Sequence, residues 1–397
     1  MARVVVGLSG GVDSSVAAAL LLEEGHEVIG LFMRNWNDAA VTLEDECPWI
    51  DDSRDAMLVA EKLGIPFQVL DLSAAYKERI VDYMFREYEQ GRTPNPDVLC
   101  NREIKFDLFL NHALLIGADF VATGHYAQRV EQNGEYRLLA GKDANKDQSY
   151  FLCQLSQAQL AKALFPLGSL EKSAVRAKAA ELGLVTAQKK DSQGLCFIGH
   201  VSLPEFLQQQ LKPKQGNVVE IEADATLLSR WLHNRSLENE SSWGLPLSPE
   251  DGRIIGQHNG AHYYTIGQRK GLNIGGKVKP LFVLQTDVVN NLVYVGQGED
   301  HPALYSPFLR VLHQDAHWVR ESAKLTVLSK QEVKCRIRYR QALLPCRLQE
   351  DELGYVLVFE EPQKAVTPGQ FLAVYIEDEL VFSGVINDFP SSLDSAI

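Results

Sequence analysis

The sequence predicts an α/β protein: a doubly wound parallel sheet in the amino-terminal half, followed by a small central domain and a carboxy-terminal antiparallel β-barrel. Strand-like and helical segments alternate until about residue 203, after which short alternating strand-like runs replace most of the helical periodicity. At roughly 100 to 200 residues per domain, the 397 residues of the chain accommodate two or three domains.

The first elements form a βαβ unit. The apolar run Val4–Leu8 precedes Ser14–Glu24, in which alanines and leucines recur at helical spacing, and Val28–Met33 is a second apolar run. Strands joined by helices imply a mostly parallel sheet with helices on both faces. The pattern continues through helical and strand-like segments at Arg54–Leu63, Phe67–Leu72, Tyr76–Glu89, Glu103–Ile116 and Phe120–Thr123.

The second half is rich in short strand-like runs of Tyr, Val, Ile, Gly and Thr. We place domains at residues 1–204, 205–286 and 287–390, and interpret the polar stretch 220–253 as an inserted loop or small subdomain. The strand-like runs are His262–Ile266, Leu281–Gln285, Leu292–Gly296, Lys334–Arg340, Gly354–Phe359 and Phe371–Ile376.

Composition excludes several classes of protein. No apolar run approaches a membrane span, and the strand-like start leads us to expect neither a signal peptide nor a membrane partner, hence a cytoplasmic protein. Six cysteines, the closest pair eleven positions apart, are too sparse for a disulfide scaffold or a Cys-x-x-Cys zinc site. A net charge of −13 argues against a nucleic-acid binder that uses its whole surface. Any RNA site is therefore expected to be a local basic patch.

A glycine-containing turn follows the first strand. Its backbone N–H groups, together with the amino terminus of the next helix, can cradle a phosphate. The turn has neither a Walker lysine nor the dinucleotide-binding glycine pattern, so we expect Asp13 to hold Mg²⁺ on a pyrophosphate. The alternative is an ordinary turn in which a serine or aspartate caps the helix. The expected ATP-binding residues here are Gly7, Leu8, Ser9, Gly10, Gly11, Val12, Asp13 and Ser14.

This turn resembles the signature of the N-type ATP pyrophosphatases, which cleave ATP between the α- and β-phosphates and adenylate a substrate oxygen. The resemblance implies that residues 1–204 are the catalytic domain. Met33 ends the second strand at the edge where such sheets bind ligands, and would face the adenine. Simple core packing is the alternative for Met33.

A proline-stiffened loop, Thr93–Asn101, carries an aspartate three residues before a cysteine at the start of a predicted helix. Asp97 could serve as acid or base, and Cys100 as a nucleophile whose thiolate the helix terminus stabilises. The alternative is a capping aspartate and a half-buried cysteine.

A second cysteine, Cys196, lies in the basic, glycine-containing stretch Lys189–Gly199, which favours a low thiol pKa and a redox or sulfur-carrying role. By contrast, Cys153 follows an aromatic and aliphatic run and Cys335 lies in an alternating strand, so both are interpreted as buried small hydrophobic residues.

Six motifs together resemble the bacterial tRNA-specific 2-thiouridylase family across nearly the whole chain. They occur in the family order at Ser9–Ser15, Thr93–Asn101, Ala122–Ala127, Lys146–Leu152, Asp191–Gly199 and Tyr264–Gly271. The resemblance implies sulfur transfer to carbon 2 of the wobble uridine in tRNAs for Lys, Glu and Gln. It further implies ATP and Mg²⁺ as cofactors, a persulfide relay protein or cysteine desulfurase as partner, and a monomer.

The resemblance also assigns roles to residues. Cys196 would carry the persulfide, Cys100 would help to release the sulfur and form a disulfide with Cys196, and Gly124 would contact the nucleotide. Asn95, Pro96 and Asp97 would bind the target base. The tRNA would be bound by Lys146, Asp147, Gln148, Arg338 and Tyr339.

A local basic patch lies between residues 330 and 347. On one strand, Lys334, Arg336, Arg338 and Arg340 would share a face and give a row of phosphate contacts, unless they are merely solvated charges. Tyr339, on the opposite side, fits a core position better than a base-stacking one.

Two other functions remain open from the residues alone. An amidating ligase of the same superfamily does not explain the two cysteines and the basic strand. A nucleotide-sensing module with a β appendage explains the phosphate turn only. Residues 220–253 are also longer and more acidic than is usual in the resembled family, which weakens the tRNA contacts expected of the central domain.

Overall fold

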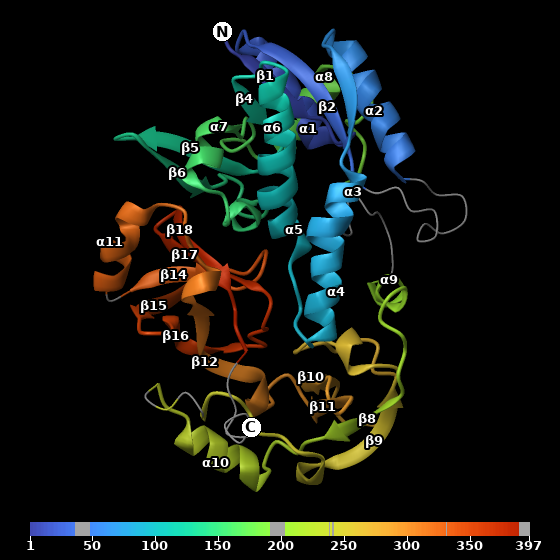
Figure 1. Cartoon of the computed structure of the whole chain (residues 1–397), viewed down its shortest axis with the longest axis vertical. Helices are drawn as coiled ribbons and strands as arrows, with labels where there is room; N and C mark the ends of the chain where they lie inside the picture. Colours follow the sequence, from blue (N-terminus) through green and yellow to red (C-terminus); the bar gives the residue numbers. More distant parts are fainter. Residues whose placement is uncertain (36–47, 191–202, 238, 240–241, 331, 389–397) are drawn as a thin grey trace.

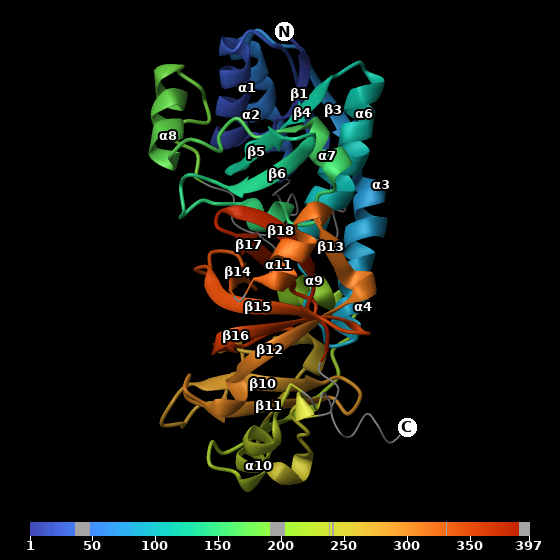
Figure 2. The ribbon, with the colours of Figure 1, turned by 90° about the vertical axis from the view of Figure 1, so that its left-hand side faces the viewer.

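A computed structural model of the chain describes residues 1–35, 48–190, 203–237, 239, 242–330 and 332–388. They form three units arranged along the long axis of the molecule (Figure 1). In the side view the carboxy-terminal sheet lies between the amino-terminal unit and the central unit (Figure 2).

The amino-terminal unit contains a parallel five-stranded sheet, as predicted. The strand order is β3-β2-β1-β4-β7, and every neighbouring pair is parallel. Val4, Val5 and Val6 in β1 are fully buried, because helices cover both faces of the sheet. The strands are β1 (Arg3–Gly7), β2 (Glu27–Arg34), β3 (Phe67–Asp71), β4 (Phe120–Ala122) and β7 (Ala163–Leu164).

The helices divide between the two faces of this sheet. Val4 and Val6 pack in one apolar cluster with α1 (Val12–Glu23) and α2 (Pro48–Leu63), whereas Val5 packs in another with the helical residues from 98 to 113. The expected helices at 76–89 and 103–116 are each built of several consecutive segments: α3 (Ser73–Tyr76), η1 (Lys77–Val81) and α4 (Asp82–Glu89), then α5 (Pro96–Leu99), η2 (Cys100–Leu108) and α6 (Phe109–Leu115). The unit is completed by η3 (Ser149–Leu152), α7 (Gln157–Lys162), α8 (Lys172–Glu181) and α9 (Leu203–Gln208).

A hairpin that the sequence reading did not predict connects this unit to the carboxy-terminal sheet. Strands β5 (Ala127–Gln132) and β6 (Glu135–Ala140) pair with each other, and β6 also pairs with β18 (Glu379–Val385). The hairpin of the amino-terminal unit therefore extends the sheet of the carboxy-terminal unit.

The central unit is a four-stranded sheet in the order β10-β11-β8-β9. Its strands are β8 (Gly216–Glu220), β9 (Arg253–His258), β10 (Leu281–Asp287) and β11 (Leu292–Gln297). The expected boundary at 287 is wrong, because it separates β10 from β11, and these two strands pair as a hairpin. The alternation of apolar and polar residues predicts a strand but not the strand with which it pairs. We therefore place this boundary between Gln297 and Tyr305.

One expectation for this region was wrong and one alternative was decided. The expected strand His262–Ile266 is not a strand, since the short 3₁₀ helix η6 (Ala261–Tyr263) overlaps its start. For the polar stretch 220–253 the structure favours a small subdomain over an inserted loop, because the stretch begins in β8 and contains α10 (Thr226–Asn234), which buries Leu228 and Trp231.

The carboxy-terminal unit is an antiparallel sheet with its own apolar core. The sheet order runs β12-β16-β15-β14-β17-β18, with β13 also paired to β18. The elements are β12 (Tyr305–Leu312), β13 (Ala316–Trp318), α11 (Lys324–Ser329), β14 (Val333–Arg336), β15 (Leu344–Glu350), β16 (Gly354–Lys364), β17 (Phe371–Ile376) and β18. Among the described residues, no helix combines the length and hydropathy that crossing a membrane requires.

Candidate active site

The glycine turn lies between β1 and α1, as predicted. Gly10 has φ of +72°, and a Cβ there would lie 2.2 Å from the Asp52 carbonyl oxygen, so only glycine fits. Helix α1 begins after Gly11 without a side-chain cap. The Ser14 hydroxyl instead accepts from the Ser9 N–H at 3.1 Å and donates to the Gly11 carbonyl at 3.2 Å. The capping alternative therefore does not describe this turn, and the uncapped helix terminus keeps its capacity for an anion.

Gly124 lies directly against this turn. A Cβ at Gly124 would be 2.7 Å from both the Asp13 carbonyl carbon and the Ser14 nitrogen. Its glycine is therefore required by close packing of two backbones, and its predicted contact with a nucleotide would be made by the backbone.

The Asp13 carboxylate forms an ion pair with Lys172, a residue that the sequence analysis did not predict at the site. Lys172 Nζ lies 2.8 Å from each carboxylate oxygen, and the Tyr126 hydroxyl donates to one of them at 2.8 Å. Lys172 is the first residue of α8, where its backbone N–H donates to Asp143 at 3.0 Å. No local pattern marks this lysine, because only the fold brings position 172 to position 13. The turn lacks a Walker lysine in sequence but has a lysine beside it in space.

The residues around Asp13 are compatible with the predicted Mg²⁺ only if ATP supplies further ligands. The described residues contain no group of three His, Cys, Asp or Glu side chains that could hold a metal ion. Magnesium in nucleotide sites is commonly held by one or two carboxylates together with phosphate oxygens. A single carboxylate at Asp13 fits that pattern once Lys172, which lies 2.8 Å from both of its oxygens, moves from Asp13 to the phosphates.

Several predicted ATP-binding side chains belong to the core. Leu8, Val12 and Met33 are between 1% and 4% exposed, and the Met33 methyl group lies 3.5 Å from the position of a Cβ on Gly7. Core packing, the alternative for Met33, is thus what the structure shows, and contacts of Gly7, Leu8 and Val12 with a ligand would come from the backbone.

The Asp97–Cys100 segment forms a short helical entry, α5, followed by the π-helical η2. The Asn95 side chain caps α5 by accepting from the Val98 N–H at 3.3 Å. Asn101 donates to the carbonyl oxygens of Asp97 and Phe151 at 3.0 and 3.1 Å. Irregular π-helical turns occur frequently at functional sites, and this one begins at Cys100.

Cys100 is more buried than expected both for a nucleophile at a helix start and for a half-buried structural cysteine. Its side chain is 0% exposed and packs in the core cluster with Leu99 and Ile104. Asp97, by contrast, is partly exposed. In this arrangement the thiol does not reach solvent, so any attack by Cys100 requires the packing around it to open.

The other thiols divide as expected where the structure describes them. Burial raises the pKa of the Cys153 thiol to about 12, and Cys335 is buried in β14, so both are small core residues. Cys196 lies outside the described residues. Lys189, which borders that stretch, donates to Asp52 at 2.8 Å and to Asp55, so its positive charge is already paired.

The predicted row of tRNA-binding cations does not form. Strand β14 ends at Arg336, and Arg340 has a left-handed φ of +64°. Arg336 is 9% exposed and pairs at 2.5 Å with Asp147, which is itself 3% exposed. A buried aspartate neutralises this arginine. The alternating cations therefore do not form one solvent-facing row, because Arg336 points into the protein.

The remaining predicted tRNA contacts are partly occupied by the protein itself. Arg338 is exposed but donates to the carbonyl oxygens of Ala365 and Lys364. Gln148 accepts from the Tyr126 N–H at 3.1 Å, and the Tyr339 ring lies 4.3 Å from that of Phe151. Lys146 is partly exposed.

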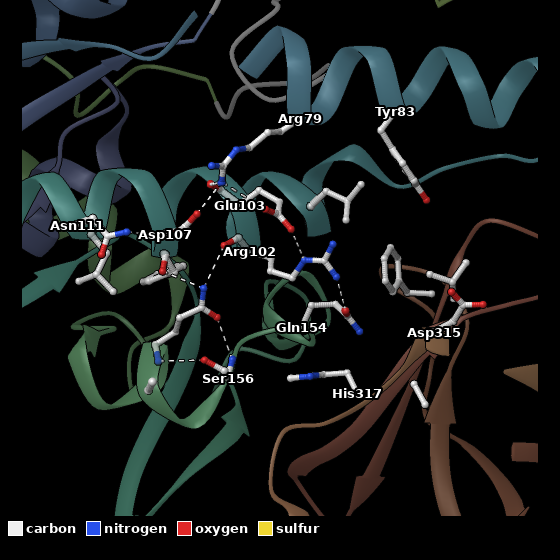
Figure 3. A pocket seen from close by; sticks show the side chains of 18 of the residues that line it. Arg79, Tyr83, Arg102, Glu103, Asp107, Asn111, Gln154, Ser156, Asp315 and His317 are labelled. Carbon is white, nitrogen blue, oxygen red and sulfur yellow. Dashed lines mark hydrogen bonds and ion pairs between the residues drawn. The ribbon is translucent and has the colours of Figure 1, made fainter. Parts of the chain in front are cut away.

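A cavity of about 950 Å³ lies where η1, α4 and η2 face the carboxy-terminal unit. Figure 3 shows Tyr83 pointing from α4 toward Asp315 and His317 of that unit. The cavity is lined by Leu99 and Arg102, which flank Cys100, but by none of the predicted ATP-, base- or tRNA-binding residues.

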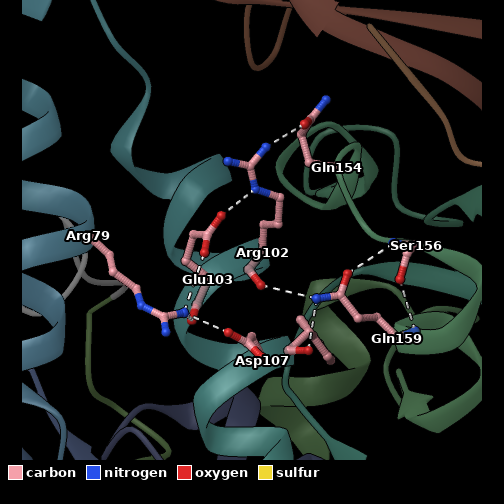
Figure 4. Close-up of polar contacts among 8 residues, drawn as sticks. Arg79, Arg102, Glu103, Asp107, Gln154, Ser156 and Gln159 are labelled. Carbon is pink, nitrogen blue, oxygen red and sulfur yellow. Dashed lines mark hydrogen bonds and ion pairs between the residues drawn. The ribbon is translucent and has the colours of Figure 1, made fainter. Parts of the chain in front are cut away.

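Four charged residues on the cavity wall, Arg79, Arg102, Glu103 and Asp107, are paired with one another (Figure 4). Arg79 donates to Asp107 at 2.6 Å, and Arg102 donates to Glu103 at 2.7 Å and to Gln154 at 2.8 Å. This network ties η2 to η1 and to the segment before α7. It stabilises the helix that begins at Cys100.

Three family models match the chain in succession. They are described as a tRNA methyl transferase HUP domain at residues 2–200, a tRNA methyl transferase PRC-barrel domain at 238–297 and an aminomethyltransferase beta-barrel domain at 310–386. The second match ends with β11, where the central sheet also ends.

Full-length relatives are similar throughout. The chain is 60% identical over 395 residues to the tRNA-specific 2-thiouridylase MnmA of Flavobacterium johnsoniae, covering 98% of this chain and 100% of that protein. Proteins of the same name from Christiangramia forsetii and Enterococcus faecalis are 57% and 46% identical, over 98% and 97% of this chain and 100% and 95% of theirs. Among solved structures, a 4-thiouridine synthetase in complex with RNA and ATP is 19% identical with a TM-score of 0.32, over 53% of this chain and 50% of that one.

Proposed function

Because this chain belongs to the tRNA-specific 2-thiouridylase family, we propose that it thiolates carbon 2 of the wobble uridine in tRNAs for Lys, Glu and Gln. The observation that carries the proposal is the full-length similarity, 60% to a named 2-thiouridylase. The glycine turn, the Asp97–Cys100 segment and Cys196 are all present in this chain. We further propose that the protein acts as a cytoplasmic monomer.

The first step would be adenylation of the uridine. The O2 oxygen of the base attacks the α-phosphorus of ATP, and pyrophosphate leaves. The N–H groups at the start of α1 and the ammonium group of Lys172 can neutralise the departing pyrophosphate, since both lie at the same turn. Magnesium, held by Asp13 and phosphate oxygens, would add positive charge there.

The second step would transfer sulfur. The outer sulfur of a persulfide on Cys196 attacks carbon 2 and AMP leaves, so the base is transiently joined to Cys196 through two sulfur atoms. The Cys100 thiolate then attacks the inner sulfur, leaving sulfur on the base and a Cys100–Cys196 disulfide, which a cellular thiol must reduce. A persulfide relay protein or cysteine desulfurase would reload Cys196.

The base and tRNA contacts are proposed from the family resemblance. Asn95, Pro96 and Asp97 would bind the target base, with the partly exposed Asp97 exchanging a proton with it. Lys146, Gln148, Arg338 and Tyr339 would contact tRNA from the seam between the catalytic and carboxy-terminal units. Asp147 would act through its ion pair with Arg336 rather than by direct contact.

The decisive experiment is mass spectrometry of nucleosides in tRNA from cells that lack this protein. We expect 2-thiouridine at the wobble position to disappear from the three tRNAs and to return when the gene is restored. Unchanged 2-thiouridine together with loss of a methylated nucleoside would instead support the methyl transfer named in two of the family models.

A further inference from the structure

The segment Thr93–Pro94, which leads into α5, is held by groups from both appended units. From the carboxy-terminal unit, the Pro368 carbonyl accepts from the Thr93 N–H at 2.9 Å. The Gln370 side-chain amide donates to the Thr93 carbonyl at 2.8 Å and to that of Pro94 at 3.2 Å. From the central unit, the Thr265 hydroxyl lies 3.1 Å from the Thr93 hydroxyl. Three units of the chain thus meet at one residue.

The contact that the carboxy-terminal unit makes with Thr93 is close and rigid. Gly369 has φ of +88°, and a Cβ there would lie 2.9 Å from the backbone nitrogen, carbon and oxygen of Thr93. The turn itself is fixed to the sheet, because Gly369 N–H donates to the Ile386 carbonyl and Ile386 N–H donates to that of Gln370. Gln370 therefore approaches Thr93 from a fixed frame.

The contact that the central unit makes with Thr93 is also held in place by hydrogen bonds. The Thr265 N–H donates to the Gln268 side chain at 3.1 Å, and the next turn is tied to β10 by a hydrogen bond from Gly267 to Val283 at 2.8 Å. Thr265 lies outside the strands, but these hydrogen bonds fix its segment to the central sheet.

The stretch between Thr93 and the proposed reacting residue Asp97 is short and stiff. Asp97 follows Thr93 by four residues, and two of the intervening residues, Pro94 and Pro96, have restricted backbone rotation. Asn95 also caps the helix that carries Asp97. A shift of Thr93 would therefore move Asp97 and Cys100. Misplacement of a reacting group by about 1 Å can reduce a rate by about 10²-fold.

We propose that Gln370 and Thr265 are positioning residues that hold the Asp97–Cys100 segment in register from two different units. The proposal deepens the proposed function and rests on it for its catalytic consequence. Neither residue touches the reacting atoms. Turnover consequently depends on correct docking of both appended units, and not only on their affinity for tRNA.

The first test replaces Gln370 and assays thiolation of an unmodified glutamate tRNA transcript. Gln370→Leu should lower kcat about tenfold with the KM for tRNA changed less than about twofold. Gln370→Glu should lower kcat further, because a carboxylate would face two carbonyl oxygens. Gln363→Leu is the matched control, since Gln363 lies in β16 of the same unit but donates to the nearby Glu361 carbonyl, and it should have no effect.

The second test uses Thr265. Thr265→Val should lower kcat severalfold, whereas Thr265→Ser retains the hydroxyl and should restore it. Because both residues hold Thr93, the Gln370→Leu/Thr265→Val double variant should lose less than the product of the two single effects.

A third measurement does not depend on thiolation. Hydrogen exchange of amides in residues 95–104 should quicken about tenfold in Gln370→Leu and remain unchanged in Gln363→Leu, with the melting temperatures of both within a few degrees of the unaltered protein. Unchanged exchange, a rise in KM alone, or a loss of activity that follows a lower melting temperature would each overturn the positioning proposal. Faster exchange in a protein that makes no 2-thiouridine would support the junction while contradicting the proposed function.

Discussion

The phosphate turn and the Asp97–Cys100 segment are both parts of the candidate active site, yet they are built in opposite ways. The hydrogen bonds that Ser14 makes within the turn, from the Ser9 N–H and to the Gly11 carbonyl, join residues at most five positions apart. The Asp13 side chain is held by the distant Lys172 and Tyr126 of the same unit. The Asp97–Cys100 segment is held at Thr93 by partners 172 and 277 positions away, in the two other units. The nucleotide end of the site thus takes its partners from its own turn and its own unit, whereas the sulfur-transfer end depends on all three units.

The comparison predicts that the two ends can be separated by mutation, and the largest effect concerns the thiols. Cys196→Ser should abolish sulfur transfer while still releasing pyrophosphate on adding tRNA and ATP, because the phosphate turn is untouched. Cys100→Ser should also lose thiolation, or retain it only with sulfide as an artificial donor. Both activities can be measured on the same tRNA.

Cys153→Ser is the control for this experiment, since its buried thiol lies outside the proposed relay. It should remain active apart from a loss of stability. Full thiolation by Cys196→Ser with the persulfide relay protein as donor would contradict the mechanism.

The next largest effect is expected on stability, where the sulfur-transfer end meets the carboxy-terminal unit. Asp147→Asn leaves the buried guanidinium of Arg336 without its counter-charge, and should lower the free energy of unfolding by about 3 kcal/mol or more. Urea denaturation would measure the change.

The partly exposed pair Lys324–Glu350 on the same unit provides a comparison for that ion pair. Lys324→Met should cost less than about 1 kcal/mol. Equal losses for the two variants would show that the Asp147–Arg336 pair is not specially important for docking.

The phosphate end can be tested through Lys172. Lys172→Met should slow pyrophosphate release about 10²-fold, because it removes a positive charge next to Asp13 at the anion-binding turn. Lys178→Met is the control, since Lys178 lies on the same helix but pairs with Glu23 at 2.7 Å. A similar slowing in both variants would indicate a general effect of helix α8 and not a phosphate contact.

The smallest expected effect concerns the basic patch. Arg338→Ala should reduce the slope of log affinity for tRNA against log salt concentration by at most about one unit, the value for a single phosphate contact. Lys324→Ala should leave the slope unchanged. A slope reduced by several units would indicate that Arg338 belongs to a row of phosphate contacts after all, which would contradict the structure.

The sequence alone was sufficient for the elements whose information is contiguous. The parallel sheet with helices on both faces followed from apolar runs and helical spacing, and the glycine turn was recognisable because all of its residues are adjacent in the chain. The family motifs were likewise contiguous. Burial of Cys153 and Cys335 also followed from their apolar or alternating neighbours.

Tertiary structure alone decided the partners of charged and polar groups. Lys172 reaches Asp13 across 159 positions, and Arg336 reaches Asp147 across 189. Sequence periodicity does not reveal such a pair, so the lysine beside the turn was not predicted and a buried arginine was assigned to the surface. Thr93, which is held by partners from two other units, is the same case. Hydrogen bonds within a turn are set by neighbouring residues, whereas the neutralisation of a buried charge is set by whichever distant chain packs against it.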